Sequence, residues 1–248
     1  MKKYIKLNLI FICCIFFLFS CNNENAFDCI KSKGKIESRE IATEDFSIIT
    51  IYNDVNLYLS HGTENKIIIK AGKNIIPKIN LTVSENNLTI SNDNTCNWAR
   101  KYGEVDIYIT SNNLEIINFS GYGDIKSLNT LTYPDLTINN DTGNGNLNLE
   151  VNSEKIHVFS RSYANITLTG TVNDLSLEYY YNHGRFYGQG LKAKNVIINH
   201  FGLNAIAVHP LTLLNTHIGH SGNVEYYNEP ANIEVITSST GKLVNHAR

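Results

Sequence analysis

A three-residue pattern returns about every 20 residues over the second half of this 248-residue chain. A small residue or Asn comes first, a mostly polar residue follows, and the third residue is apolar and opens an alternating segment. The seven occurrences are Gly123-Asp124-Ile125, Gly145-Asn146-Leu147, Ala164-Asn165-Ile166, Gly184-Arg185-Phe186, Asn204-Ala205-Ile206, Gly222-Asn223-Val224 and Gly241-Lys242-Leu243. Their apolar residues are 22, 19, 20, 20, 18 and 19 positions apart, which is too regular for unrelated loops. A repeat of this length predicts a solenoid whose coils stack on one another.

A second alternating segment falls between most of these positions. The examples are Leu136 to Ile138, Ile156 to Val158, Leu175 to Leu177, Val196 to Ile198 and Ile233 to Val235. Each coil therefore offers at least two short strands, and alternation directs every second side chain into a shared core. The small corner residue indicates either a positive φ or a lack of room for a Cβ. We predict an all-β fold, a single-stranded β-helix or solenoid with coils of about 20 residues.

The segment from residue 45 to residue 119 is also rich in strand patterns, but their spacing is less regular. It forms either the first, atypical coils or a cap, because the end of a solenoid must be shielded. We therefore expect one domain over residues 45–248, with a less regular or capping part at 45–119 and regular repeats at 120–248.

The N-terminus is typical of an exported protein. Three lysines precede an apolar run from Leu9 to Phe19, which predicts a signal peptide over residues 1–20. The run is shorter than the roughly 20 residues that a stable transmembrane helix needs. The segment from Leu18 to Cys21 resembles a bacterial lipobox, so we expect Cys21 to be lipidated and residues 21–44 to begin as a tether. The alternative is a simple secretory signal that happens to end at this Cys.

Two cysteines remain in the folded part once the signal peptide and Cys21 are set aside. They are Cys29 and Cys96. In an oxidising compartment such a pair predicts one disulfide, and the alternative is two buried free thiols. A catalytic Cys is disfavoured, because neither residue has a His nearby in the sequence.

Several segments resemble one known family. They are Cys29-Ile30, Phe46 to Ile49 followed by Asp54 to Leu57, Asn94 to Trp98, Ser120 to Ile125, Ser221 to Tyr227, and Thr240 to Leu243. On these segments the chain is similar to the family of auto-transporter adhesins with a head GIN domain, over most of the mature chain. The resemblance implies an exported bacterial β-solenoid protein with an adhesin role. The central corners at Ser160 to Tyr163 and His183 to Arg185 depart from the Gly-rich pattern of the family.

One aromatic segment stands out as a candidate binding surface. It comprises Tyr179, Tyr180, Tyr181, His183, Arg185 and Tyr187. Alternation must expose some of these rings, and exposed rings beside hydrogen-bonding groups suit the recognition of sugars or proteins. The plainer interpretation is that the rings only cover the flank of the solenoid.

Other kinds of site receive little support from the sequence. The formal net charge is -2, from 21 basic and 23 acidic residues, so we expect no nucleic-acid partner. Asp124 is the one acid in its column of corner residues, which does not make a pair of catalytic carboxylates. The histidines at 200, 209, 217 and 220 lack further ligands at suitable spacing, so we expect no metal, no cofactor and no catalytic residue.

These observations favour a non-enzymatic lipoprotein of the cell envelope, at the outer membrane, that binds a glycan or an envelope or host protein. The membrane would be contacted through the lipid anchor. One alternative is a carbohydrate-active enzyme, a polysaccharide lyase or hydrolase, on the same scaffold. Another is a periplasmic structural or signalling partner.

Overall fold

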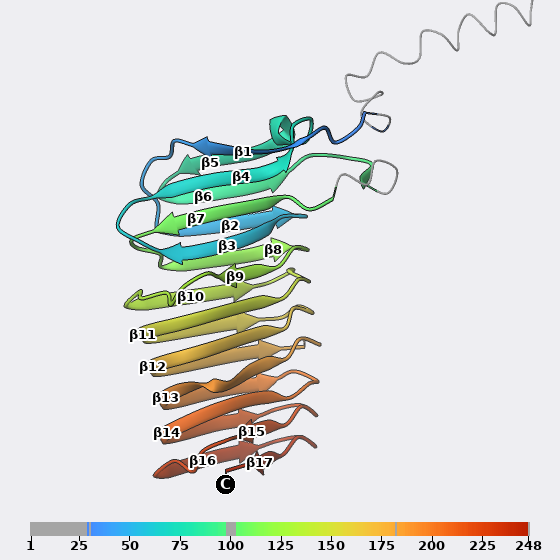
Figure 1. Ribbon diagram of the computed structural model, residues 1–248. Helices are drawn as coiled ribbons and strands as arrows, with labels where there is room; N and C mark the ends of the chain where they lie inside the picture. The colour runs from blue at the N-terminus through green and yellow to red at the C-terminus, as the bar shows by residue number, and fades with distance from the viewer. Residues whose placement is uncertain (1–28, 30, 98–102, 182, 248) are drawn as a thin grey trace, which may run out of the picture.

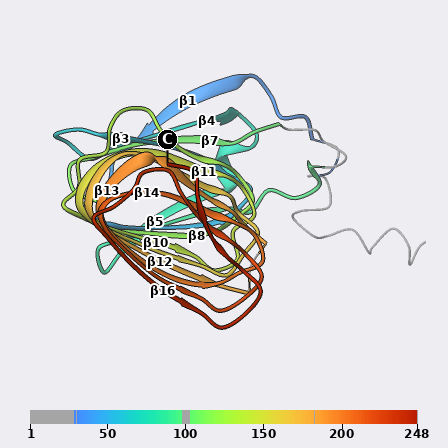
Figure 2. The same cartoon turned by 90° about the horizontal axis from the view of Figure 1, so that it is seen from below.

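The computed structural model describes residues 29, 31–97, 103–181 and 183–247. These residues form seventeen strands that wind into a stack of coils along one axis (Figure 1). Seen from one end, the coils superpose around a single core (Figure 2). Among these residues, no helix is long and apolar enough to cross a membrane.

The strands are numbered in chain order. Their bounds are β1 (Ile36–Ile41), β2 (Ile48–Asn53), β3 (Asn56–His61), β4 (Lys66–Gly72), β5 (Ile79–Ser84), β6 (Asn87–Asn92), β7 (Asp106–Ser111), β8 (Ile116–Gly121), β9 (Ile125–Ser127), β10 (Asp135–Asn140), β11 (Leu147–Ser160), β12 (Ile166–Tyr180), β13 (Phe186–Phe201), β14 (Ile206–Ile218), β15 (Val224–Tyr226), β16 (Asn232–Thr237) and β17 (Leu243–Asn245). A single turn of 3-10 helix, η1 (Ile76–Lys78), precedes β5.

Two parallel-stranded faces enclose the core. The first face contains β3, β9, the N-terminal halves of β11 to β14, and then β15 and β17. The second face contains β2, β8, β10, the C-terminal halves of β11 to β14, and β16. The four long strands therefore bend from one face to the other, and the small-residue corners return the chain to the first face.

The register confirms the repeat that the sequence predicts. The seven apolar residues of the pattern are stacked partners on successive coils: Ile125, Leu147, Ile166, Phe186, Ile206, Val224 and Leu243. All are buried except Leu243, which lies in the last coil and is partly exposed. The column continues beyond the predicted repeat through Leu57 and Ile107.

Close packing between coils explains the small residue at the corners. A Cβ added to Gly145 would overlap the carbonyl oxygen of Gly123 on the preceding coil. Gly241 stands in the same relation to the carbonyl oxygen of Gly222. The described glycines with positive φ are Gly34, Gly103 and Gly170, and none of them belongs to the repeated pattern. Glycine is therefore required at these corners because there is no space for a Cβ, and not because the backbone is left-handed.

The polar residue of the pattern joins neighbouring coils. Oδ1 of Asp124 accepts a hydrogen bond from the backbone N–H of Asn146 at 3.0 Å. Oδ1 of Asn165 and Oδ1 of Asn223 do the same for the N–H groups of the next coils, at 3.1 and 2.9 Å. Asn and Asp recur at this position because their short side chains satisfy a backbone donor one coil away.

The segment over residues 45–119 contains a coil and most of a cap, and the cap also takes in β1 (Ile36–Ile41), so the folded part begins before residue 45. The coil formed by β2 and β3 pairs with β8 and β9 on one side, and with β6 and β7 on the other. Strands β1, β4 and β5 then close the end through antiparallel pairs, β1 with β4, β4 with β7 and β5 with β6. The described chain thus begins at the capped end with β1, enters the stack with β2 and β3, runs back out to the cap with β4 and β5, and then returns to the stack (Figure 1).

A disulfide ties the start of the described chain to this cap. Cys29 and Cys96 are bonded across a sequence separation of 67 residues. The predicted pairing is therefore confirmed, and the alternative of two free thiols is not realised. The bond joins the residues before β1 to the loop that follows β6. Cys21 and the predicted signal peptide lie outside the described residues.

Candidate binding surfaces

The six residues of the predicted aromatic surface follow the chain around one small-residue corner. Tyr179 and Tyr180 end β12 on the second face, and Tyr181 and His183 belong to the corner loop. Tyr187 lies on the first face, where it pairs with Thr167 and Ala207. The corner thus separates Tyr187 from Tyr180.

Tyr179 does not belong to an exposed surface. Its side chain is 0% exposed, and it packs in the core beside Phe186 and His200 with ring centroids 6.3 and 6.4 Å away. Burial raises the pKa of its phenol. The prediction that Tyr179 belongs to the binding surface was therefore wrong. Side chains alternate along a strand, and since Leu175 and Leu177 point inward, Tyr179 does too.

Outward-facing rings on neighbouring coils form a surface that we call the aromatic corner: Phe159, Tyr163, Tyr180, Tyr181, His183 and Phe201. Tyr180 and Phe201 are register partners on neighbouring strands, and their rings stack at 5.5 Å with an interplanar angle of 8°. Phe159 lies on the other side of Tyr180, with centroids 6.0 Å apart. All three rings are half-buried on the outer side of the second face.

The corner loops add rings that stand further into solvent. Tyr163 stacks on His183 at 5.2 Å with an interplanar angle of 4°. Tyr181 is 79% exposed and has a positive φ of 50°. For a bulky residue this backbone conformation is unusual, and it directs the ring away from the core column that holds Tyr179.

Charged groups border the aromatic corner. The guanidinium of Arg161 forms a two-point contact with the carboxylate of Asp141 on the preceding coil, with Nη2 to Oδ2 at 2.9 Å. This bond holds the pKa of the Asp141 carboxyl below its usual range. Burial, followed by the charge of Glu178, raises the pKa of the Tyr180 phenol. Arg185 is exposed at the corner itself.

Phe159, Tyr163 and Phe201 are members of the aromatic corner that sequence reasoning missed. They are remote from the Tyr179 to Tyr187 segment in the chain but adjacent to it in the stack. The spacing from Tyr180 to Phe201 is 21 residues, close to one coil, so applying the repeat to outward positions would have found this pair.

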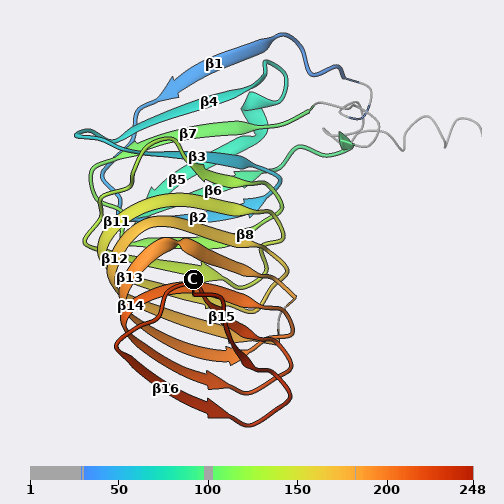
Figure 3. The same cartoon turned by 60° about the horizontal axis from the view of Figure 1, so that its bottom comes forward.

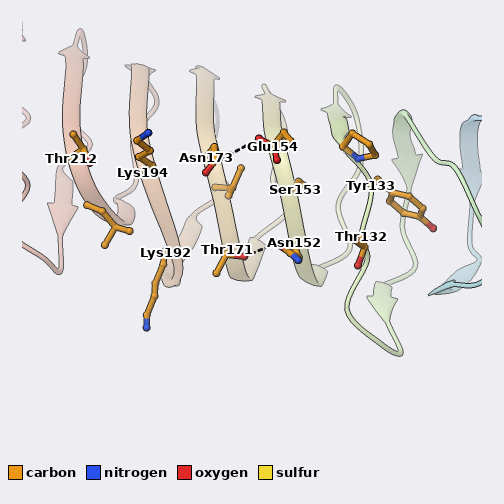
Figure 4. Close-up of a pocket in the computed structure, with 13 residues that line it drawn as sticks. Thr132, Tyr133, Asn152, Ser153, Glu154, Thr171, Asn173, Lys192, Lys194 and Thr212 are labelled. Atoms are coloured by element: carbon orange, nitrogen blue, oxygen red, sulfur yellow. Dashed lines mark hydrogen bonds between the residues drawn. The ribbon is translucent and has the colours of Figure 1, made fainter.

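A second surface is a groove of about 670 Å³ where the long strands bend between the two faces (Figure 4). Its walls come from successive coils, and most of the residues that line it are of polar types. Thr171 donates a hydrogen bond to Oδ1 of Asn152 at 2.8 Å, and Asn173 donates one to the carboxylate of Glu154. Lys192 and Lys194 lie on the next strand, and both are exposed. This groove was not predicted from the sequence.

The other sequence candidates occupy structural positions. Although burial acts in the opposite direction, hydrogen bonds from Asn146 and Lys126 lower the pKa of the Asp124 carboxyl. Asp124 is thus part of the corner ladder. His200 is fully buried, whereas His217 stacks its ring edge-on against Phe201 at 5.0 Å. Within the described residues, no three His, Cys, Asp or Glu side chains gather as a potential metal site.

Solved structures share this fold. A crystal structure described as a "putative adhesin" from Bacteroides fragilis has a TM-score of 0.78 at 24% identity, covering 85% of this chain and 97% of that one. A "putative adhesin" and a "putative lipid binding protein", both from Parabacteroides distasonis, give TM-scores of 0.60 and 0.59 at 16% identity. They cover 86% and 88% of this chain, and 97% and 96% of their own chains. These likenesses concern the fold.

No curated protein compared with the chain matches it significantly. The family described as "Putative auto-transporter adhesin, head GIN domain" matches residues 45–230, which is most of the chain. The match covers β2 to β15, which include the cap strands β4 and β5 but not β1, and it ends before the last coil of β16 and β17. The chain therefore belongs to this head GIN domain family of auto-transporter adhesins.

Proposed function

We propose that this protein is an exported lipoprotein of the cell envelope that binds its ligand without catalysis through the aromatic corner. The ligand is a glycan, or the surface of an envelope or host protein. The lipid anchor is Cys21, and the membrane is the outer membrane. The adhesin description of the family and of its structural relatives supports a binding role.

The single observation that carries this proposal is the ladder of rings across three coils. Neighbouring coils hold Phe159, Tyr180 and Phe201 in contact, so that no rearrangement is needed to present them. Flat rings provide large contact areas with little loss of conformational entropy, and the tyrosine hydroxyls add hydrogen bonds. Such a surface suits the apolar faces of sugar rings or a protein side chain.

The disulfide supports export, because such bonds persist in oxidising compartments. It also bears on how an anchor at Cys21 would hold the domain. Seven residues lie between Cys21 and Cys29, and the eight steps from one to the other span at most about 28 Å in a fully extended chain. Since Cys29 is bonded to the cap, the cap is the end nearest the membrane in this proposal.

The groove chemistry supports binding over turnover. Hydrolysis of glycosidic bonds generally needs two carboxyl groups on either side of the bond. Of the residues that line the groove, Glu154 alone carries a carboxylate, and Asn173 already donates a hydrogen bond to it. A carbohydrate-active enzyme on this scaffold is therefore the second candidate, distinguished by release of shortened or unsaturated sugars.

The test is binding of the purified protein to a glycan array and to immobilised envelope and host matrix proteins. Replacing Tyr180 and Phe201 together by Ala removes two adjacent rings, and we expect affinity to fall at least about tenfold. Tyr227→Ala is the matched control, because this exposed tyrosine lies after β15, outside the aromatic corner. Unchanged binding in the double variant would overturn the proposal, as would release of cleaved glycan.

A further inference from the structure

The two ends of the solenoid differ, and the C-terminal end is open. In the second face, Val158, Leu177 and Ile198 form one inward column and are at most 1% exposed. Thr216, which is 1% exposed, and then Val235 continue this column, yet Val235 in the last coil is 46% exposed. Ile233 likewise follows the buried Leu214 and is 37% exposed. Since β16 is the last strand of the second face (Figure 3), the apolar core is exposed to solvent at Ile233 and Val235.

The backbone at this end also lacks a neighbour. Within the described residues, β16 pairs with β14 alone and β17 pairs with β15 alone. Their outer edges thus present unpaired N–H and C=O groups beside exposed Ile233, Val235 and Ile236. A strand edge of this kind is a template for pairing with another strand.

The capped end carries the opposite features. The outermost strand there, β1, holds Glu37, Arg39 and Glu40 within six residues. Glu40 and Glu37 form ion pairs with Lys66 and Lys73. Charges on an edge strand oppose pairing with further chains. Stacking of the open end onto the capped end of another molecule is therefore disfavoured, and a partner with the same open edge fits better.

We propose that the C-terminal coil stacks on the C-terminal coil of a second copy of this chain, with β16 paired antiparallel to β16 across a two-fold axis. Such an isologous contact closes at two molecules, since each open end is used once. It covers the exposed core column of both copies with the same apolar column. The inference stands on the open end alone and does not depend on the ligand of the aromatic corner.

The side chains of β16 select one register. A two-fold axis at Val235 places Val235 opposite itself, Ile233 opposite Thr237 of the other copy, and Glu234 opposite Ile236. Inward residues then face inward residues, as the pleat requires. An axis at Glu234 would set two carboxylates directly opposite one another, which is destabilising. Glu234 also accepts a hydrogen bond from Asn215 within its own chain.

The register leads to a crosslinking test on the full chain purified in detergent. Opposed residues in an antiparallel pair have Cα atoms about 4.5–5.5 Å apart, within the range of a disulfide. We expect Val235→Cys to give a disulfide-linked dimer under mild oxidation. Ile233→Cys and Thr237→Cys are matched controls on the same side of the same strand. In a dimer of either variant alone, the two cysteines would be offset by four residues along the strand, or about 14 Å at about 3.4 Å per residue, and should not link. In a mixture of the two variants, the cysteine at position 233 of one copy would lie opposite the cysteine at position 237 of the other, and we expect a disulfide between them.

A second variant tests the contact without cysteine chemistry. Light scattering should give the unmodified protein the mass of two chains. Val235→Arg places a charge at the two-fold axis, and we expect the dissociation constant of the dimer to rise at least about a hundredfold. Val235 is half-exposed in a single chain, so folding is preserved, which circular dichroism checks. A monomeric mass for the unmodified protein, or linking by Ile233→Cys alone as efficient as by Val235→Cys, would overturn the proposal.

Discussion

The cap and the regular coils are both built from β-strands but are held together differently. In the coils from β8 to β17, each strand pairs in parallel with the strand about 20 residues away, and the corners repeat. In the cap, β1, β4 and β5 form antiparallel pairs. The strands β2 and β3, which lie between β1 and β4 in the chain, belong instead to a coil of the stack. The regular part is therefore held together by contacts between successive coils of similar length, whereas the cap is held together by contacts between segments that are distant in the sequence.

The two regions differ in how far apart in the sequence their contacting residues are. A coil in the regular part loses little chain entropy when it adds to the stack, because its partner is one repeat away. The cap must bring residue 29 to residue 96, and β2 to both β6 and β8. A covalent bond is found at the region where closing the chain is most costly in entropy. The following predictions separate the two regions by experiment.

Removing the disulfide should have the largest effect and should be confined to the cap. Replacing Cys29 and Cys96 together by Ser frees a loop closed over 67 residues, which lowers the free energy of unfolding by about 4 kcal/mol in the chain-entropy model. Hydrogen exchange should then rise in β1, β4 and β5 but not in β12 and β13. The unmodified protein under reducing conditions serves as the control. Equal loss of protection in all strands would show that the two regions unfold as one.

Gly145→Ala should break the regular part without affecting the cap. The added Cβ overlaps the carbonyl oxygen of Gly123, so the coils must move apart. We expect the free energy of unfolding to fall by about 3 kcal/mol. Ala164 occupies the equivalent corner one coil further on, and Ala164→Gly is the matched control, with an expected loss of about 1 kcal/mol. Chemical denaturation monitored by circular dichroism measures both. Comparable small losses in the two variants would show that the corner has room to adjust.

The regular coils could be predicted closely because one physical rule repeats in them. The apolar residue after each corner must be inward, and the spacing alone placed Ile125 to Leu243 in one column. The cap could not be predicted in this way. Alternation identifies β2 and β3 as strands but carries no information on which later strand inserts beside them, since that depends on packing between distant segments.

The candidate surface was predicted in part for a related reason. Alternation within β12 places Tyr179 and Tyr180 on opposite sides of the strand, so the inward positions of Leu175 and Leu177 are enough to predict that Tyr179 is buried. The contact of Tyr180 with Phe159 and Phe201 required the register between coils. The groove required more, because it arises where several strands bend, and no local sequence pattern marks that shape.

His200 offers the smallest and most local test, because it is a titratable residue inside the regular core. Its side chain is 0% exposed, and its Nδ1 accepts a hydrogen bond from the N–H of Gly202 at 3.3 Å. Burial lowers the pKa of the imidazole to about 4, from its ordinary value of 6.5. Below pH 6.5 the unfolded chain therefore binds a proton that the folded chain excludes, and stability falls as the pH decreases.

The expected change follows from these two pKa values. Between pH 7.5 and pH 5 the free energy of unfolding should decrease by about 2 kcal/mol through His200 alone. His200→Leu places an apolar side chain next to Ile218 in the same column, and should remove this part of the pH dependence. Denaturation curves of both proteins at the two pH values give the difference. If both proteins lose the same stability on acidification, the acid-sensitive groups lie elsewhere, and the buried imidazole does not set the lower pH limit of the regular coils.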